Sequence, residues 1–320
     1  DEDLVEVGAD GVSLVEFTLD GNRDNQPGDR QSSGVLVTGA SNVRIASGHV
    51  EDVSRHGLRV VDSSVGTSRV EDDPIHVDRG PISDVTVQDV RVDRPRRDGC
   101  SVEGPDLRNV SVENVRTVGS SDRGSVEVKD GASDAYVGNC YAEDCVYGVA
   151  VQDHGEYPTA NVRIAGNTAV DCETLVDAQT SHPPEDVVVT GNTGRDLGGD
   201  GMGGPGGIHA HLIEGLVVAD NIVDGVDGPG IAIRGCVDAT VTGNVVRGTD
   251  GPGIACRGGE RAAGEDEPAR TSELQVSDNR CAGGIELAGA VDRYLVTGNL
   301  LDGSVAEDAE GSGIVANNLG

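Results

Sequence analysis

GIAIRGCVDATVTGNVVRGTDGPGIACR, residues 230–257, contains the pattern that decides the fold. A glycine followed by a short apolar run, Gly230–Ile233, returns about 23 residues later as Gly253–Cys256. Between the two copies lies Ala239–Asn244, in which Val and Thr alternate before a Gly-Asn pair. Self-similarity at a period of roughly 20 to 50 residues is typical of a chain built from stacked repeats.

The glycine-led apolar strand recurs along the chain. Its copies begin at Gly34, Gly57, Gly99, Gly148, Gly207, Gly230, Gly253, Gly284 and Gly313. Related segments at Ile75, Val126 and Val176 fill the wider intervals. Stacking such repeats places each strand about 4.8 Å from its next copy, in a parallel sheet.

An asparagine follows the second strand of most copies. The series is Asn114, Asn139, Asn167, Asn192, Asn221, Asn244, Asn279 and Asn299. A side-chain amide carries both donors and an acceptor, so asparagines stacked at one corner of successive coils can bond one another. The sequence therefore predicts an internal ladder made of these eight residues.

These repeats predict an all-β parallel β-helix of about 11–12 coils. A single coil cannot bury its apolar face alone, so residues 1–320 are expected to form one domain. Loop insertions rich in Gly, Pro and charge are expected near 21–34, 194–207 and 258–271. The composition agrees, because Val, Ile and Ala replace the large residues of helical cores, with one Phe, one Met and no Trp.

The chain is strongly acidic, with 56 Asp plus Glu against 24 Lys plus Arg, a formal net charge of -32 and Lys129 as its single lysine. Molar salt shortens the Debye length to about 3 Å and makes such self-repulsion tolerable, so a high-salt environment is predicted. Nucleic acid is not an expected partner, because no basic patch with interleaved aromatic residues is present. Membrane insertion is not expected either, because no apolar run approaches about 20 residues.

Seven cysteines occur, none in a CxxC pair with metal-like spacing. Most occupy inward strand positions, so they are expected to be buried free thiols, with a Cys140–Cys172 disulfide as the alternative.

The glycine-led strands, the asparagine series and the opening Phe17–Asn22 together resemble the pectate-lyase-like superfamily of right-handed parallel β-helix proteins, over nearly all of the chain. The resemblance implies a right-handed helix and work on carbohydrate. The superfamily includes polysaccharide lyases, glycoside hydrolases, uronan epimerases and viral tailspikes, so these motifs specify a fold and no single reaction.

Alternation along each glycine-led strand predicts which side chains face outward. The first outward position, one residue after the inward anchor, carries Leu36, Arg59, His76, Ser101, Glu127, Ala150, Asp177, His209 and Ala232. The second outward position, two residues further on, carries Thr38, Val61, Asp78, Glu103, Lys129, Gln152, Gln179, His211 and Arg234. The middle of this stripe is rich in titratable groups.

Asp78, Glu103 and Lys129 are expected to form one column with about 5 Å between neighbours, with His76 and Glu127 beside it. Two carboxylates at that spacing repel, which raises one pKa and supplies the acid and the base of glycoside cleavage. Lys129 is alternatively the base or the charge neutraliser in β-elimination of a uronate. The structural alternative is a solvated ladder of surface charges.

A second candidate catalytic cluster comprises Asp153, His154, Tyr157 and His182, in the loops past the stripe. His and Tyr near carboxylates serve as base and acid in lyases and epimerases. Residues expected to bind substrate are Arg59, Gln152, Tyr157, Asp177, Gln179, His209, His211 and Arg234, with Arg257 at the end of the stripe. The arginines among these residues would bind the carboxylate or sulfate groups of the substrate.

No cofactor is certain and no metal ligands are assigned. Calcium is possible because Asp20, Asn22, Asp24 and Asp29 supply hard oxygen atoms, although no EF-hand or nonapeptide calcium repeat occurs.

The predicted function is that of an extracellular, polysaccharide-active protein, a lyase or glycoside hydrolase that works on a glycan, most simply an acidic one, in a groove on the outer strand face. One alternative is a virion tailspike or surface adhesin that binds a cell-surface glycan, as a homotrimer in the tailspike case. The other is a purely structural solenoid.

Overall fold

The computed structural model describes residues 3–26, 31–62, 81–153, 157–180, 184–198, 206–259 and 269–320. Over these residues the protein is all-β, with parallel strands and one short 3-10 helix, Arg23–Asn25. None of the described helical structure is long and apolar enough to cross a membrane. The chain divides into two compact units, residues 1–162 and 163–320. The expectation of one domain stays a prediction.

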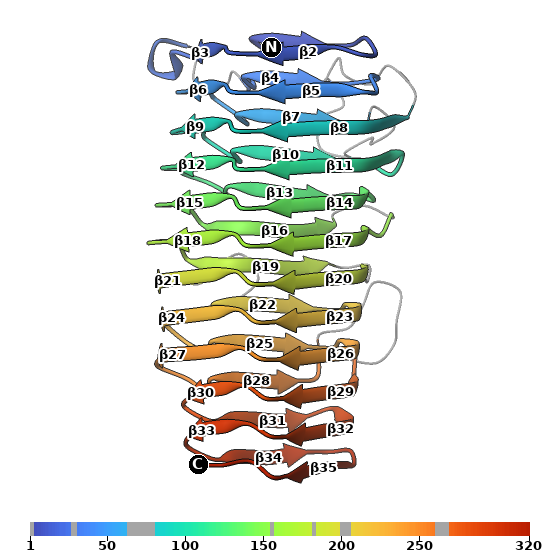
Figure 1. The fold of residues 1–320 in the computed structure, drawn as a ribbon, viewed down its shortest axis with the longest axis vertical. Helices are drawn as coiled ribbons and strands as arrows, with labels where there is room; N and C mark the ends of the chain where they lie inside the picture. Colours follow the sequence, from blue (N-terminus) through green and yellow to red (C-terminus); the bar gives the residue numbers. More distant parts are fainter. Residues whose placement is uncertain are drawn as a thin grey trace. The chain divides into compact units, whose positions relative to one another are not determined.

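In the first unit, strands from three parallel sheets alternate along the chain, and each strand pairs with the strand three places on (Figure 1). Sheet A contains β1 (Val5–Val7), β4 (Val35–Val37), β7 (Leu58–Val61), β10 (Cys100–Glu103), β13 (Val126–Lys129) and β16 (Tyr147–Asp153). Sheet B contains β2 (Ser13–Val15), β5 (Val43–Ala46), β8 (Ile82–Gln88), β11 (Leu107–Glu113), β14 (Ser133–Gly138) and β17 (Ala160–Ala165), which spans the division. Sheet C contains β3 (Thr18–Asp20), β6 (His49–Glu51), β9 (Arg91–Asp93), β12 (Arg116–Val118) and β15 (Tyr141–Glu143).

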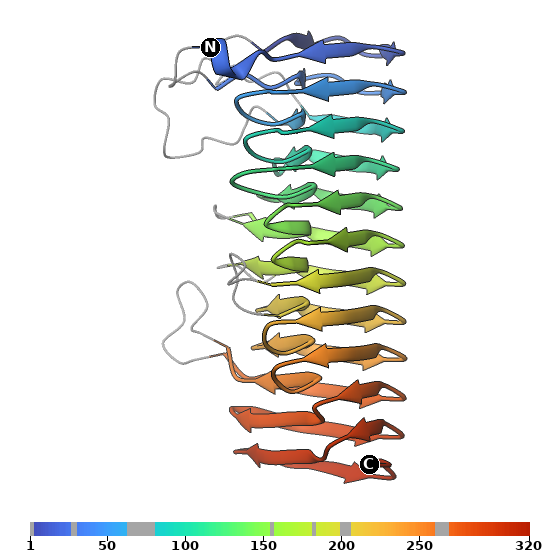
Figure 2. The ribbon, with the colours of Figure 1, turned by 90° about the vertical axis from the view of Figure 1, so that its left-hand side faces the viewer.

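The second unit repeats this order. Sheet A contains β19 (Thr174–Thr180), β22 (Ile208–His211), β25 (Ile231–Arg234), β28 (Ile254–Arg257), β31 (Ile285–Gly289) and β34 (Val305–Ala309). Sheet B contains β20 (Glu185–Thr190), β23 (Glu214–Ala219), β26 (Val237–Thr242), β29 (Thr271–Ser277), β32 (Val291–Thr297) and β35 (Gly313–Ala316). Sheet C, on the side that faces the viewer in Figure 2, contains β18 (Thr168–Val170), β21 (Thr193–Leu197), β24 (Ile222–Val226), β27 (Val245–Thr249), β30 (Arg280–Ala282) and β33 (Leu300–Asp302).

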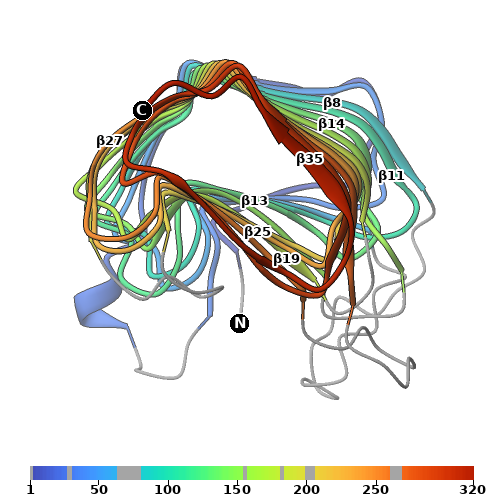
Figure 3. The ribbon, with the colours of Figure 1, turned by 90° about the horizontal axis from the view of Figure 1, so that it is seen from below.

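Counted over the described residues, the three sheets contain 12, 12 and 11 strands. The predicted right-handed parallel β-helix of about 11–12 coils is confirmed. In the first unit β13 forms one side and β8, β11 and β14 another, with the core between them (Figure 3). The inward residues Val35, Leu58, Cys100, Val126 and Val149 are fully buried, as the alternation predicts. Each such apolar side chain contributes about 1.5–3 kcal/mol to folding.

One expected strand is wrong. A coil around Ile75 was expected between the strands at Leu58 and Cys100, but Leu58 pairs directly with Cys100. No strand therefore lies between β7 and β10 in sheet A. Ile75, His76 and Asp78 lie outside the described residues.

The predicted insertions agree in part. Between β28 and β29, residues 258–271 contain no strand where the structure describes them, apart from Thr271 itself, which begins β29. The insertion near 21–34 contains the helix Arg23–Asn25. The insertion at 194–207 begins later than expected, because β21 continues to Leu197.

The asparagine ladder is confirmed in the second unit. Asn192 donates hydrogen bonds from its backbone N and its Nδ2 to Asn221 Oδ1, both at 2.9 Å, and Asn221 bonds Asn244 in the same way at 3.0 Å. Each amide also donates to a backbone carbonyl, as Asn221 Nδ2 does to Val189 at 3.0 Å. The ladder consists of Asn167, Asn192, Asn221, Asn244, Asn279, Asn299 and Asn318.

Asn114 and Asn139 do not belong to this ladder, so that part of the prediction is wrong. At the corners where a Gly-Asn pair follows the sheet B strand, as at Gly191 and Asn192, the glycine takes the left-handed backbone conformation. Its φ is 64° at Gly191, and the asparagine that follows points inward. In the first unit the asparagine itself takes that conformation, with φ 52° at Asn114 and 54° at Asn139. The inward position then belongs to the residues that follow, Val115 and Cys140, which are buried.

All seven cysteines are buried and free, as predicted. Burial raises the pKa of the Cys140 and Cys236 thiols to about 12, so these groups are protonated and act as small apolar side chains.

Candidate functional site

The outer face of sheet A in the first unit carries part of the predicted stripe. Glu103 pairs with Val61 on β7, so the expected place of Asp78 beside Glu103 is wrong. Glu103 on β10 pairs with Lys129 on β13, and Ser101 pairs with Glu127. Arg59 on β7 lies beside Ser101. Because residues two apart on a strand share a face, Arg59, Glu103, Glu127 and Lys129 all lie outside the core on one face.

These outward side chains are nevertheless buried. The exposed fractions are 5% at Arg59, 3% at Glu103, 0% at Glu127 and 7% at Lys129. A ladder of solvated surface charges therefore does not describe them. Buried ionisable groups require partners, because desolvating each ion costs several kcal/mol.

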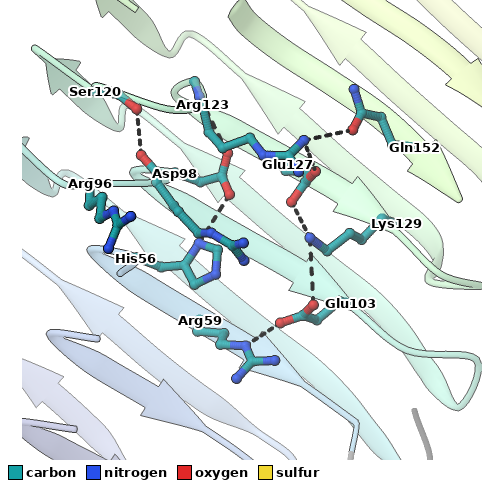
Figure 4. A network of polar contacts seen from close by, with 12 residues as sticks. His56, Arg59, Arg96, Asp98, Glu103, Ser120, Arg123, Glu127, Lys129 and Gln152 are labelled. Carbon is teal, nitrogen blue, oxygen red and sulfur yellow. Dashed lines mark hydrogen bonds and ion pairs between the residues drawn. The ribbon is translucent and has the colours of Figure 1, made fainter. Parts of the chain in front are cut away.

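The partners form a continuous row of alternating charge, which we call the charge row: Arg59, Glu103, Lys129, Glu127 and Arg123 (Figure 4). Arg59 Nε donates to Glu103 Oε1, and Lys129 Nζ donates to Glu127 Oε2. Lys129 Nζ also lies 3.7 Å from Glu103 Oε2, and Arg123 Nη1 lies 3.7 Å from Glu127 Oε1.

The two glutamates of the charge row differ in pKa. Burial alone would raise the pKa of Glu103, but the charges of Arg59 and Lys129 outweigh it and hold that pKa well below its usual range. Burial and the nearby Asp98 carboxylate raise the pKa of Glu127, against the opposing effect of Lys129. The pair thus contains one carboxylate that stays ionised and one carboxyl that binds a proton more readily.

Lys129 remains a cation. Burial works to lower its pKa, but the carboxylates of Glu127 and Glu103 raise it above the ordinary value. A protonated lysine can neutralise charge but cannot accept a proton, so the arrangement favours charge neutralisation over the role of a base.

A second polar chain runs beside the charge row and was missed in the sequence. Tyr147 donates from its hydroxyl to Asp98 Oδ1 at 2.7 Å, and Asp98 Oδ2 lies 3.0 Å from His56 Nδ1. Figure 4 shows His56 and Asp98 directed toward each other beside the charge row. His56, Asp98 and Tyr147 each precede the glycine that opens a sheet A strand, which is the sequence signal that places them in one column.

Burial determines the protonation of this second chain. Burial and the neighbouring Arg55 lower the pKa of His56 well below its usual value, so its imidazole is neutral. Burial and Asp98 raise the pKa of Tyr147 well above its usual value, so its hydroxyl keeps its proton. Apart from the 3.0 Å contact between Nδ1 and Asp98 Oδ2, neither ring nitrogen of His56 has a polar partner in the described part of the chain.

Gln152 lies close to this site, and of the second predicted cluster the structure describes Asp153 and Tyr157. Arg123 Nη1 donates to Gln152 Oε1 at 3.1 Å. Asp153 instead accepts hydrogen bonds from the backbone N of Asp130 at 2.7 Å and of Thr159 at 3.0 Å, a structural role. Tyr157 is 53% exposed. His154 and His182 lie outside the described residues.

The second unit contains the remaining predicted binding residues on its own sheet A. Asp177 pairs with His209, and Gln179 pairs with His211, on β19 and β22. His209 Nδ1 lies 3.2 Å from Asp177 Oδ1, and the rings of His209 and His211 are stacked with their centroids 6.3 Å apart. Arg234 on β25 pairs with His211 and with Arg257 on β28.

Within the described ranges, no group of three or more His, Cys, Asp or Glu residues is arranged to hold a metal ion. Of the residues considered for calcium, Asp20 accepts a hydrogen bond from the backbone N of Asn22 at 2.8 Å, and Asp29 lies outside those ranges.

Several solved structures share this fold. The chain is similar to the A-module of mannuronan C-5 epimerase AlgE6 of Azotobacter vinelandii, with a TM-score of 0.62 and 14% identity over 99% of this chain and 77% of that one. It is also similar to the N-terminal fragment of bacteriophage phi29 gene product 12, with a TM-score of 0.69 and 16% identity over 96% of this chain and 58% of that one. The catalytic domain of a GH87 alpha-1,3-glucanase, in complex with nigerose, matches with a TM-score of 0.58 and 14% identity over 97% of this chain and 55% of that one.

At these identities the similarity shows the fold alone, and the chain spans little more than half the length of the last two structures. No curated protein sequence matches the chain. The family model described as right handed beta helix region matches residues 33–194, half of the chain, and the protein therefore belongs to that family.

Proposed function

We propose that this protein is a glycoside hydrolase that cleaves a polysaccharide at the charge row of the first unit. The observation that carries the proposal is the placement of two buried glutamates, Glu103 and Glu127, on the two sides of Lys129 Nζ, which contacts both carboxyl groups. Their unequal surroundings displace the pKa of Glu103 downward and that of Glu127 upward. Glycoside cleavage needs this division, one carboxyl group as acid and one carboxylate as base or nucleophile.

In this reaction Glu127 donates its proton to the glycosidic oxygen as the bond to the anomeric carbon breaks. In the inverting form of the reaction, Glu103 removes a proton from the water that attacks this carbon. In the retaining form, Glu103 attacks the carbon itself, and the glycosyl-enzyme is then hydrolysed by a water whose proton passes to the deprotonated Glu127. In both forms the sugar gains a hydroxyl from water and the leaving sugar gains a hydrogen. Arg59 and Lys129 keep Glu103 ionised for this step. Glu127 Oε1 is buried, lies 3.7 Å from Arg123 Nη1 and makes no hydrogen bond in the described structure.

The energetics of the charge row support a functional role. A buried ion pair is seldom more stable than an apolar pair of similar volume, so five ionisable side chains on this face add little to the stability of a solenoid. Perturbed pKa values in such clusters are typical of catalytic sites.

A lyase is the second candidate, favoured by the chain from Tyr147 through Asp98 to His56. A neutral imidazole can remove the proton next to a uronate carboxylate, and a protonated tyrosine can supply a proton to the leaving oxygen. Arg123, whose side chain is 19% exposed, would neutralise the substrate carboxylate. An adhesin or tailspike would use the same face for binding alone, and the similarity to a bacteriophage protein keeps that alternative open.

Incubation with a panel of neutral, uronate and sulfated polysaccharides in high salt tests the proposal, with reducing ends and the ultraviolet absorbance of unsaturated products followed together. We expect reducing ends without absorbance, and their loss in Glu127→Gln by a factor of roughly 100 to 10,000. The matched control is Glu143→Gln, an exposed glutamate on β15 of the same unit. Absorbance that His56→Gln abolishes would replace the hydrolase with the lyase, and binding without either product would replace both with an adhesin.

The setting that we propose follows from composition. A net charge of -32 suits a protein that works outside the cell or on a virion surface in high salt, with a polysaccharide or cell-surface glycan as its partner.

A further inference from the structure

The outer face of sheet A in the second unit carries a row of basic residues. His211, Arg234 and Arg257 occupy the same position on the adjacent strands β22, β25 and β28, in direct register. Neighbouring strands place them about 4.8 Å apart. Like charges directly opposite one another destabilise a sheet, so the adjacent Arg234 and Arg257 cost stability unless an anion offsets them.

Among the described residues, Arg257 has such an anion and Arg234 has none. Arg257 donates from Nε and Nη2 to Glu286 Oε1 at 2.8 and 2.6 Å. The guanidinium of Arg234, half-buried, makes no hydrogen bond or ion pair with the part of the chain that the structure describes. In a protein with 56 acidic residues, a half-buried arginine without a carboxylate is available to an external anion.

His209 lies beside this arginine and presents a second open polar atom. Its Nδ1 lies 3.2 Å from Asp177 Oδ1, and Gln179 Nε2 donates to Asp177 Oδ2 at 3.3 Å. Asp177 therefore holds the Nδ1 proton and leaves Nε2 as an acceptor. That atom has no partner in the described structure, although His209 is only 1% exposed.

The strand next to His209 carries small side chains beside these groups. His209 pairs with Ala232, which in turn pairs with Ala255, so the positions beside the basic row carry methyl groups. Ala232 shares a face with Arg234, two residues along β25. Ala232 is buried, whereas Arg234 is half-buried, so the guanidinium is the accessible group on that face of β25.

We propose that this face of the second unit binds the oxyanion of an acidic sugar, a carboxylate or a sulfate ester. Arg234 forms paired hydrogen bonds to the oxyanion, and His211 and Arg257 flank it on the neighbouring strands. The inference deepens the proposed function, on which the identification of the ligand as a glycan rests. It narrows the ligand from polysaccharides in general to acidic ones.

Calorimetric titration of the Glu127→Gln protein tests this site without cleavage. The probes are oligogalacturonate, a sulfated galactan oligosaccharide and a neutral dextran oligosaccharide, in roughly 1 M salt so that general repulsion is screened. We expect binding of an acidic probe that Arg234→Gln weakens by roughly 10- to 100-fold, with a smaller loss in Arg234→Lys, which keeps charge but not the paired geometry. Arg247→Gln, an exposed arginine on β27 of the same unit, is the matched control and leaves binding unchanged.

Preference for oligogalacturonate identifies a carboxylate ligand, and preference for the galactan identifies a sulfate. The inference is overturned if Arg234→Gln binds as tightly as its parent, or if no acidic probe binds. Binding of an acidic probe by a protein that cleaves nothing leaves this inference standing and removes the hydrolase. Cleavage of a neutral glycan that Arg234→Gln leaves unaffected would support the hydrolase and overturn this inference.

Discussion

Tyr147 and Asp98 are joined by a hydrogen bond of 2.7 Å that passes over an intervening strand, 49 residues apart in the chain. The residue between them in the stack is Gly124, and a Cβ atom added there would lie 2.0 Å from Cδ2 of Tyr147. The tyrosine ring therefore occupies the space that any larger residue at position 124 would need. A glycine makes this part of the site possible.

Gly124→Ala should break the contact between Tyr147 and Asp98. The added methyl group forces the ring aside, so we expect a loss of about 1–3 kcal/mol in the free energy of unfolding. Urea denaturation measures it. Gly198→Ala is the control, because its new Cβ would meet only the flexible end of Asp227, at 3.2 Å. Equal stability of the two variants would contradict the packing described here.

The opposite pKa shifts of the two glutamates predict opposite pH dependence of stability. The pKa of Glu103 is lower in the folded protein, so its contribution is present above the unfolded pKa of about 4.3 and is lost as the pH falls. Glu103→Gln should cost about 3 kcal/mol near pH 7 and progressively less below pH 4, in urea titrations at several pH values.

Glu127 serves as the internal comparison for that experiment. Its folded pKa is raised, so its contribution is present below the unfolded pKa and is lost as the pH rises through the folded value. The cost of Glu127→Gln should therefore shrink as the pH increases. Parallel pH profiles for the two variants would show that the charges are not arranged as described.

Lys129 links the two glutamates, and its removal should move the pH optimum of activity. In Lys129→Met both carboxylates lose a positive neighbour, which raises both pKa values. The acid and alkaline limbs of the profile of kcat/KM against pH should both shift to higher pH. Arg116→Met, on β12 of the same unit, removes an equal charge away from the site and should leave the profile unchanged.

The sequence was sufficient for the fold because the glycine-led strands fix both the coil and its register. Alternation alone placed Glu103 beside Lys129 and His209 beside Asp177, as the strand pairing confirms. It failed at Ile75, where an apolar residue preceded by proline looked like another rung although β7 pairs directly with β10. A repeat pattern cannot distinguish a rung from a long connection when both contain a short apolar segment.

A repeat pattern could not predict that the stripe is buried or that His56 lies beside it. Alternation shows which side of a strand a residue faces, but the exposure of that side depends on segments distant in sequence. His56, Asp98 and Tyr147 come from three different coils and lie before or at the first residue of their strands, outside the positions at which alternation was applied. Asn114 was misplaced by one residue, because asparagine and glycine both adopt the left-handed conformation at that corner.

The asparagine ladder predicts a localised stability contribution in the second unit. Asn221→Ala removes the acceptor for two Asn192 donors and leaves buried polar groups without partners, so we expect a loss of at least about 2 kcal/mol. Asn114→Gly is the control, because it keeps the left-handed backbone and removes only an exposed hydrogen bond to Asp89. A similar urea midpoint for both variants would mean that the ladder contributes nothing beyond the backbone sheet.

The net charge predicts that salt stabilises the protein. At low ionic strength the 56 acidic residues repel over a Debye length of about 30 Å, whereas at 1 M salt that length falls to about 3 Å. Because unfolding moves the charges apart, screening should favour the folded state, and the urea midpoint should rise between about 0.01 and 1 M NaCl and then level off.

Sucrose at matched water activity is the control, because it stabilises by exclusion without screening charge. If sucrose reproduces the whole increase, or if NaCl lowers the midpoint, the acidic surface is not an adaptation to high salt. If the rise is specific to NaCl, salt belongs in every assay of the charge row, because the folded state that carries it would then depend on the ionic strength.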